Sequence, residues 1–278
     1  MLDDLIEIFR SLAKSLDVLY VIKGDKPAGR IIASEGDLDS YKRFFKKHDI
    51  HYSLSDYKLR KETDENKYSN KGVALPRDSE EKGELFIYFS KDKALAEKAK
   101  HAEKDSDHKE LGRMLGYPEC CTDFFNKEFP KQSRYKNDYV LASLRESKGF
   151  IFPFQNNISI RHLDLSLLSH FPCNLNCPKS KEMAGKNFEL LEKDSPDLAR
   201  ISEGMLKGAV VFTSNRGIFL LRDIKMEKDK LYYDKIMASM KNEIYDELKM
   251  SKAIEIIDKN TIMIRDKKIE DIGMMVFI

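Results

Sequence analysis

All four cysteines of the 278-residue chain occur in two short stretches. GYPECC covers residues 116–121 and HFPCNLNC covers residues 170–177. Each cysteine pair lies directly before, or in the first turn of, a segment that begins a helix with a proline start signal. The free N–H groups and the positive end of a helix favour thiolate over thiol, and thiolate is the form that binds metals. If the two stretches meet in the fold, four sulfurs converge between two helix ends, which favours a thiolate-ligated metal centre.

The first 104 residues have the pattern of an α/β region. Apolar residues at helical spacing predict a helix over 2–16, and the run VLYVIKG predicts a strand over 18–24 that ends at Gly24. A nearly continuous apolar run predicts a strand buried on both faces over 84–90. The same reasoning predicts a strand over 29–34, helices over 36–50 and 92–104, and an exposed polar loop over 58–72.

The remaining residues change character twice. Residues 105–205 are predicted to be helical, with helices over 108–116, 119–129, 137–147, 162–171 and 178–193 and an irregular connection over 150–161. Residues 206–278 contain strand-like runs separated by turn-forming residues, which predict a small antiparallel β lobe. The predicted class is therefore α+β, with three regions: an α/β region over 1–104, a helical cysteine-bearing domain over 105–205 and a β-rich lobe over 206–278.

The spacing of the cysteines bears on which metal centre they would form. Structural zinc uses cysteines separated by two to four residues, and Cys173 and Cys177 fit that pattern loosely. Cys120 and Cys121 do not fit it, because adjacent side chains are expected to diverge. An iron–sulfur cluster offers different irons to neighbouring thiolates, so an adjacent pair suits a cluster better than one ion.

The four cysteines are also compatible with roles that need no cluster. They could be small buried hydrophobic residues beside helix ends, or ligands of a structural zinc ion together with one histidine. They could also carry out redox or nucleophilic thiol chemistry without a metal. The sequence leaves these roles open.

A few polar residues close to the cysteines are further candidates. His170 precedes Cys173 by three residues and is a candidate ligand or hydrogen-bond donor to a sulfur, although a histidine there also suits a helix C-terminal cap. Lys179 and Ser180 lie in the first turn after Cys177 and are candidates for anion binding. Motifs for nucleotide phosphates, dinucleotides, serine hydrolases and zinc proteases are absent from the sequence.

Composition narrows the partners and the compartment. The 49 basic and 47 acidic residues are well mixed, so the net charge of +2 gives no strong signal for nucleic acid. No apolar run is long enough to cross a bilayer, and the first residues lack the pattern of a signal peptide. We expect a cytoplasmic protein without a membrane partner, whose cysteines are kept reduced. The sequence identifies no other partner.

The two cysteine stretches together resemble a known family. LGYPECCTDFF, followed about fifty residues later by HFPCNLNCPKS, is similar to the paired GYPxCC and HxPCxxxC motifs of a mostly archaeal family classed as a domain of unknown function. The resemblance covers about residues 105–190 and implies an archaeal, cytoplasmic protein. It implies no reaction.

The leading hypothesis is a cytoplasmic metalloprotein that binds an iron–sulfur cluster through Cys120, Cys121, Cys173 and Cys177, with a role in redox chemistry or in binding a sulfur-containing or anionic substrate. The alternative is a non-catalytic binding or scaffold protein with a structural zinc ion or packed thiols. Whether the chain is an enzyme is left open by the sequence.

Overall fold

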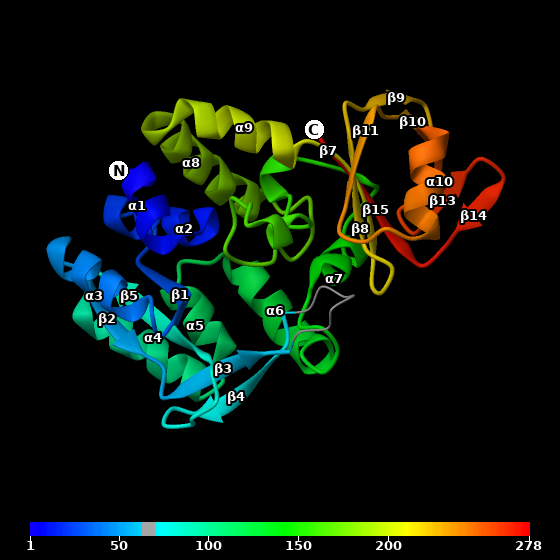
Figure 1. Cartoon of the computed structure of the whole chain (residues 1–278). Coiled ribbons are helices and arrows are strands. Elements are labelled where there is room, and N and C mark those ends of the chain that lie inside the picture. The colour runs from blue at the N-terminus through cyan, green and yellow to red at the C-terminus, as the bar shows by residue number, and fades with distance from the viewer. Residues whose placement is uncertain (63–69) are drawn as a thin grey trace.

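A computed structural model describes residues 1–62 and 70–278 of the chain. The described residues form ten α-helices and fifteen strands, and the strands make three five-stranded sheets. The α+β class expected from the sequence is therefore confirmed. Figure 1 shows the first sheet and its helices at one end of the molecule, the helices that carry the cysteines in the middle, and the two C-terminal sheets at the other end.

The N-terminal sheet is antiparallel and has β5 (Glu84–Ser90) at its centre. β5 pairs along its whole length with β1 (Ala28–Ser34) and on its other side with β2 (His51–Leu54) and β3 (Tyr57–Lys61). The last strand, β4 (Gly72–Pro76), pairs with β3. Burial of β5 on both faces is confirmed, because Ile87 and Phe89 face one hydrophobic cluster while Tyr88 faces another.

Helices cover both faces of this sheet. The cluster that contains Ile87 and Phe89 also holds side chains of α1 (Leu2–Phe9), α2 (Leu12–Lys23) and α3 (Leu38–Lys47). The cluster around Tyr88 holds side chains of α4 (Lys93–Lys104) and α5 (His108–Met114).

Two predictions in this region are wrong. The segment over 18–24 is not a strand but the second half of α2, which ends where Gly24 adopts a left-handed conformation with φ of 86°. Residues 18–21 are all buried, and periodicity cannot separate a strand from a helix that is buried all round. The helix expected over 2–16 is divided in two, because Arg10 is also left-handed and Ser11 then caps α2.

The loop expected over 58–72 is only partly a loop. Its first residues belong to β3 and its last residue begins β4, so the polar side chains lie along an antiparallel pair. Residues 63–69 lie outside the described part of the chain.

The middle of the chain is largely helical, as expected. It contains α6 (Glu119–Gln132), α7 (Val140–Arg145), α8 (Pro178–Asp194) and α9 (Pro196–Leu206). Between α7 and α8 the chain forms only the two-residue strand β6 (Ile151–Phe152) and two 3₁₀ turns, Phe154–Asn156 and Arg161–Leu163.

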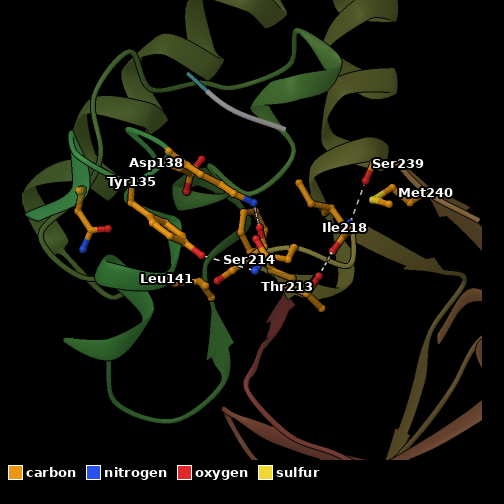
Figure 2. Close-up of a pocket in the computed structure, with 13 residues that line it drawn as sticks. Tyr135, Asp138, Leu141, Thr213, Ser214, Ile218, Ser239 and Met240 are labelled. Atoms are coloured by element: carbon orange, nitrogen blue, oxygen red, sulfur yellow. Dashed lines mark hydrogen bonds between the residues drawn. The ribbon is translucent and has the colours of Figure 1, made fainter. Parts of the chain in front are cut away.

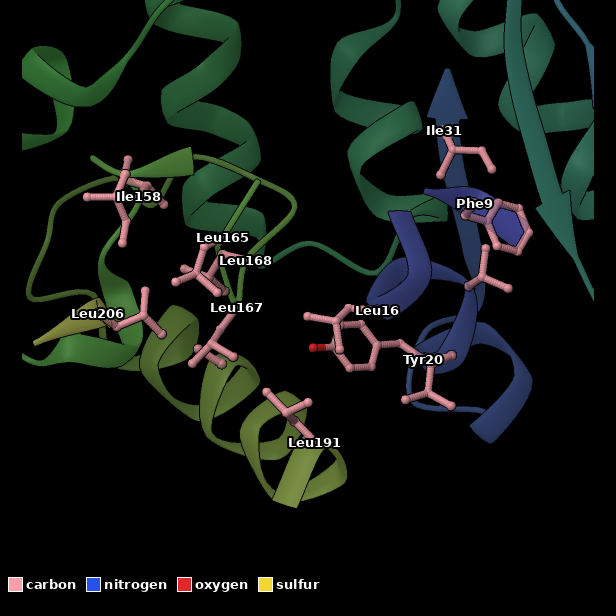
Figure 3. Close-up of a cluster of buried hydrophobic side chains, with 14 of the residues drawn as sticks. Phe9, Leu16, Tyr20, Ile31, Ile158, Leu165, Leu167, Leu168, Leu191 and Leu206 are labelled. Carbon is pink, nitrogen blue, oxygen red and sulfur yellow. The ribbon is translucent and has the colours of Figure 1, made fainter. Parts of the chain in front are cut away.

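The helix expected over 162–171 is not present. Asp164 adopts a left-handed conformation with φ of 59°, which ends the short 3₁₀ turn. Ser166 then bonds with both the N–H and the C=O of Leu168, so its side chain replaces the hydrogen bonds that a helix would have made. Figure 3 shows Leu165, Leu167 and Leu168 of this irregular segment in the hydrophobic core, with Leu191 of α8 nearby and Leu16 and Tyr20 of α2 on the other side.

The C-terminal region contains two sheets, in which all the described strand pairs are antiparallel except the pair of the last strand with β6. It also contains one helix that the sequence did not predict. The first sheet has the order β11 (Lys235–Ala238), β8 (Ile218–Arg222), β7 (Gly208–Thr213), β15 (Ile272–Phe277), β6. The second has the order β14 (Lys267–Ile269), β13 (Thr261–Ile264), β12 (Ala253–Asp258), β10 (Lys230–Tyr232), β9 (Lys225–Glu227). The additional helix is α10 (Glu243–Ser251).

Strand β15 lies between two hydrophobic cores. Met275 and Phe277 pack into the large cluster that also contains α1, α2 and α8, whereas Met274 and Val276 pack into the core of the C-terminal lobe. β6 pairs with β15 in parallel, so a strand from the middle of the chain completes this sheet. The three predicted domain ranges stay a prediction, and side chains from all three meet in the large cluster.

A pocket lies where the C-terminal lobe meets the segment between α6 and α7. Figure 2 shows Tyr135 and Asp138 from that segment, and Leu141 of α7, facing Thr213, Ser214 and Ile218 of the β7–β8 hairpin. The cysteines are not among the residues that line it.

No helix in the described residues is long and apolar enough to cross a bilayer.

Lys259 connects the C-terminal lobe to α7. Its Nζ donates to the carbonyl oxygens of Leu144, Arg145 and Ser147 at 3.0, 2.8 and 2.7 Å, which lie at and just beyond the C-terminal end of α7. We expect Lys259→Met to lower the free energy of unfolding by about 1–3 kcal/mol, the cost of hydrogen bonds to a charged group. Denaturant unfolding measures this change.

Lys268→Met is the matched control. Lys268 pairs with Glu270 on the surface and both side chains are more than half exposed, so its loss should cost less than about 0.5 kcal/mol. Equal effects of the two substitutions would contradict the role given to Lys259.

Candidate metal centre

The two cysteine stretches meet at the N-terminal ends of two helices. Cys120 and Cys121 are in the first turn of α6, which begins at Glu119 directly after Pro118 at the N-cap position. Cys177 is the N-cap residue of α8, whose first residue is Pro178. Cys173 lies in the loop that leads to α8. Both helix starts are therefore where the prolines of the sequence predicted them.

The four sulfurs form one compact group. All four Sγ atoms lie within 4.8 Å of one another. Cys120 Sγ is 3.9 Å from Cys121 Sγ and 3.8 Å from Cys177 Sγ, and Cys121 Sγ is 3.7 Å from Cys177 Sγ. All four cysteines are free thiols. The group can hold a metal ion.

The expectation that the adjacent cysteines diverge is wrong. Neighbouring positions on a helix point about 100° apart, but each thiol has three rotamers about its own Cα–Cβ bond. The rotamers adopted by Cys120 and Cys121 bring their sulfurs to the same side of the helix end. The adjacency therefore does not by itself favour a cluster over one ion.

The four thiols differ in exposure. Cys121 and Cys177 are 2% and 1% exposed, whereas Cys120 and Cys173 are half-buried. One side of the group thus faces the protein interior and the other reaches solvent.

Hydrogen bonds also reach the sulfurs unequally. Cys121 Sγ accepts the backbone N–H of Cys173 at 3.3 Å and lies 3.2 Å from Ser180 Oγ. Cys173 Sγ accepts from Asn174 Nδ2 at 3.4 Å. Hydrogen bonds from the Cys121 and Cys173 thiols, and from Ser180, hold the pKa of Cys177 far below its usual range.

His170 reaches the sulfurs through Ser180. His170 Nε2 is 2.9 Å from Ser180 Oγ, which in turn contacts Cys121, and His170 is not one of the residues in the ligand group. Burial and the nearby charge of Lys26 lower the pKa of His170 to about 3, so its imidazole is neutral near pH 7. Of the two residues proposed for anion binding, Ser180 is fully buried against the sulfur group and Lys179 is exposed on α8.

Several residues that position the site were not identified from the sequence. Asn156 is buried, and its Nδ2 donates to the carbonyl oxygens of Leu175 and Cys177 at 3.1 Å each. Ser143 donates to Pro172 O at 2.7 Å. The only signal for Asn156 was two consecutive asparagines between apolar residues in the stretch FQNNISI.

A buried ion pair lies on the other side of His170. The ring of Tyr117 is 5.0 Å from the His170 ring, and Lys26 Nζ is 5.3 Å from the centre of the Tyr117 ring. Lys26 pairs with Asp17, and both side chains are at most 5% exposed. Ser169, next to His170, donates to the same carboxylate. These contacts attach the cysteine loop to α2.

The chain matches no family model, no curated protein and no solved structure in the comparisons with known proteins. The resemblance to the archaeal motif family therefore stays a prediction. The class defined by the fold and the site is an α+β protein with one four-cysteine centre between two helix ends.

Ser147 holds the loop that carries Cys173 and Cys177. Its Oγ accepts the N–H of Leu175 at 2.7 Å and donates to Ser143 O at 2.6 Å, and both Ser147 and Leu175 are buried. Ser147→Ala leaves the N–H of Leu175 without an acceptor in the interior, so we expect a loss of about 1–3 kcal/mol in the free energy of unfolding, measured by denaturant titration.

Ser133→Ala is the control for this substitution. Ser133 Oγ donates to Phe129 O one turn earlier along α6, a bond whose loss leaves no N–H unpaired. We expect a change below about 0.5 kcal/mol. A Ser147→Ala protein as stable as Ser133→Ala would show that the loop does not depend on this bond.

Proposed function

We propose that this protein binds one metal ion, zinc in the first place, through the four thiolates of Cys120, Cys121, Cys173 and Cys177. The ion would join the start of α6 to the loop before α8, and so hold the middle of the molecule together. The proposal rests on the spacing of the sulfurs.

The spacing is that of ligands on one tetrahedral ion. Zinc–sulfur bonds of about 2.3 Å place tetrahedrally arranged sulfurs about 3.8 Å apart. Three of the sulfur pairs are separated by 3.7, 3.8 and 3.9 Å, and no pair exceeds 4.8 Å. Hydrogen bonding between thiols gives a similar spacing for two or three sulfurs, but convergence of all four on one point is what a single cation requires.

The iron–sulfur cluster of the leading hypothesis fits this spacing less well. A cluster distributes its thiolates over several irons, so the cysteine sulfurs stand farther apart than on one ion. A single iron held by the same four thiolates remains compatible with the geometry, because tetrahedral sulfur sites suit both zinc and iron.

A four-thiolate ion of this kind has a structural rather than an open catalytic coordination sphere. Structural zinc sites have four protein ligands, whereas catalytic sites keep one position for water or substrate. All four positions are supplied here by the chain, and two of the four thiols are almost fully buried. The site therefore supports the alternative of a zinc-stabilised fold more than a redox cluster.

We expect the protein purified under reducing conditions to carry about one zinc or iron per chain and no acid-labile sulfide. Removal of the metal by a chelator should lower the melting temperature, because the binding free energy of a structural ion contributes to folding. Elemental analysis, sulfide analysis and thermal unfolding measure the three quantities. Cys177→Ser should lower the metal content, while Ser133→Ala should leave it unchanged.

Two outcomes would contradict the proposal in different ways. Iron with an equal amount of sulfide would show a cluster instead of one ion. A chain that takes up no metal, even when zinc is supplied to the reduced protein, would leave packed thiols or metal-free thiol chemistry.

A further inference from the structure

We propose that Cys120 is a nucleophilic thiolate of this centre, which accepts an alkyl group from an uncharged or cationic alkyl donor. The inference rests on the proposed function, because it takes the four cysteines as thiolate ligands of one ion. It adds an activity to a site whose four protein ligands otherwise indicate a structural role alone.

Exposure separates the four sulfurs into two pairs. Cys121 and Cys177 are 2% and 1% exposed, so an electrophile from solvent cannot approach either sulfur along a bonding direction. Cys120 and Cys173 are half-buried and lie on the side of the group that reaches solvent. Only these two sulfurs can react with an electrophile from solvent without opening of the fold.

Hydrogen bonds separate the two accessible sulfurs. Asn174 Nδ2 donates to Cys173 Sγ, and such a bond withdraws electron density from a thiolate and must be weakened for the sulfur to react. Cys120 Sγ has only thiols within hydrogen-bond distance among residues 1–62 and 70–278. Once those thiols are deprotonated ligands, none of them donates to it. Cys120 is thus the one sulfur that is both accessible and without a donor.

The remaining donors favour the same residue. Cys121 receives the Cys173 N–H and faces the Ser180 hydroxyl, which stabilises its negative charge on the buried side. The charge that these bonds do not stabilise is concentrated on Cys120, at the first turn of α6. With hydrogen bonds distributed unevenly in this way, one thiolate is more nucleophilic than the other three.

The proposed step is a simple alkyl transfer. A lone pair of Cys120 Sγ attacks the saturated carbon of the donor, the new S–C bond forms, and the bond from that carbon to the leaving group breaks. The leaving group departs with its electron pair, so neither an oxidant nor a reductant is needed. Cys120 becomes a neutral thioether. Four thiolates around one divalent cation carry net negative charge, and this charge favours donors that are uncharged or cationic.

The test uses the zinc-loaded full-length chain and iodoacetamide as the alkyl donor. Samples are taken over time and unfolded, the remaining thiols are labelled with a second reagent, and each cysteine is quantified by fragmentation mass spectrometry, which separates the adjacent Cys120 and Cys121. We expect Cys120 to react about tenfold faster than any other cysteine, a difference of about 1.4 kcal/mol in activation free energy. Labelling of Cys173 at the same rate or faster, equal labelling of all four, or no labelling would each overturn the inference.

A pair of variants tests the hydrogen-bond argument. Asn174 Oδ1 accepts the N–H of Asn176, so Asn174→Asp keeps this acceptor but removes the donor to Cys173. We expect the labelling rate of Cys173 to rise about tenfold in this variant. Asn176→Asp adds the same charge to the same loop without a bond to sulfur, and should leave that rate unchanged. An unchanged Cys173 rate in Asn174→Asp would show that this bond does not select the reactive sulfur.

Iodoacetate tests the charge of the donor. Relative to iodoacetamide, it should react with Cys120 more slowly in the zinc-loaded protein than in the unfolded chain, because the centre repels its carboxylate. The preference for uncharged or cationic donors would be overturned if the rate of iodoacetate divided by that of iodoacetamide at Cys120 were equal or larger in the zinc-loaded protein than in the unfolded chain.

Zinc content, measured on the same samples, separates the two proposals. One zinc per chain at the start, with Cys120 no faster than its neighbours, would overturn only the alkyl-transfer inference. No bound zinc or iron at the start would overturn the proposed function and the inference with it.

Discussion

The fold depends on a buried segment that has almost no regular secondary structure. Residues 153–177 form two 3₁₀ turns but no α-helix or strand, and many of them are buried, so part of their backbone needs partners other than a regular helix or sheet. Buried polar side chains take this role. Asn187 donates to Leu167 O, Asn157 within the segment donates to Leu206 O, and Asn156 bonds to the carbonyls before α8. Each of these side chains fixes a backbone position, and together they fix where the second cysteine pair lies.

The same segment explains how distant parts of the chain support the cysteines. Lys259, from the C-terminal lobe, caps the end of α7, and Ser143 and Ser147 of that region bond to the loop that carries Cys173 and Cys177. On the opposite side, the Lys26–Asp17 pair attaches the loop to α2. The loop is therefore held from both ends of the molecule, and a metal ion would strengthen its connection to the start of α6, where the Cys173 N–H and Ser180 already contact Cys121.

The sequence predicted the elements whose signals are local and missed those that tertiary contacts decide. Proline marked the starts of α6 and α8 correctly, and Gly24 marked the end of its element, although that element is the helix α2 and not the predicted strand. The apolar run over 18–24 was assigned to a strand, because a helix buried all round has no polar face to give it a helical period. The leucines over 162–171 suggested a helix, yet Leu165, Leu167 and Leu168 are buried from an irregular segment, in which the Ser166 side chain bonds to the backbone of Leu168.

The four candidate ligands could be predicted from the sequence, but the differences in hydrogen bonding between their sulfurs could not. Two proline-linked pairs of cysteines were enough to expect four sulfurs in one place, and they do meet. Their number and spacing in the sequence give no information on which sulfur receives a hydrogen bond, because the donors are a backbone N–H, Ser180 and Asn174, whose directions are set by the turn before α8. These donors reach Cys121 and Cys173, whereas Cys120 Sγ has only thiols within hydrogen-bond distance among residues 1–62 and 70–278. Cys120 and Cys121 are adjacent in α6 yet differ in these contacts, so the difference between the thiols is set by the loop and the first turn of α8 and not by position in the sequence.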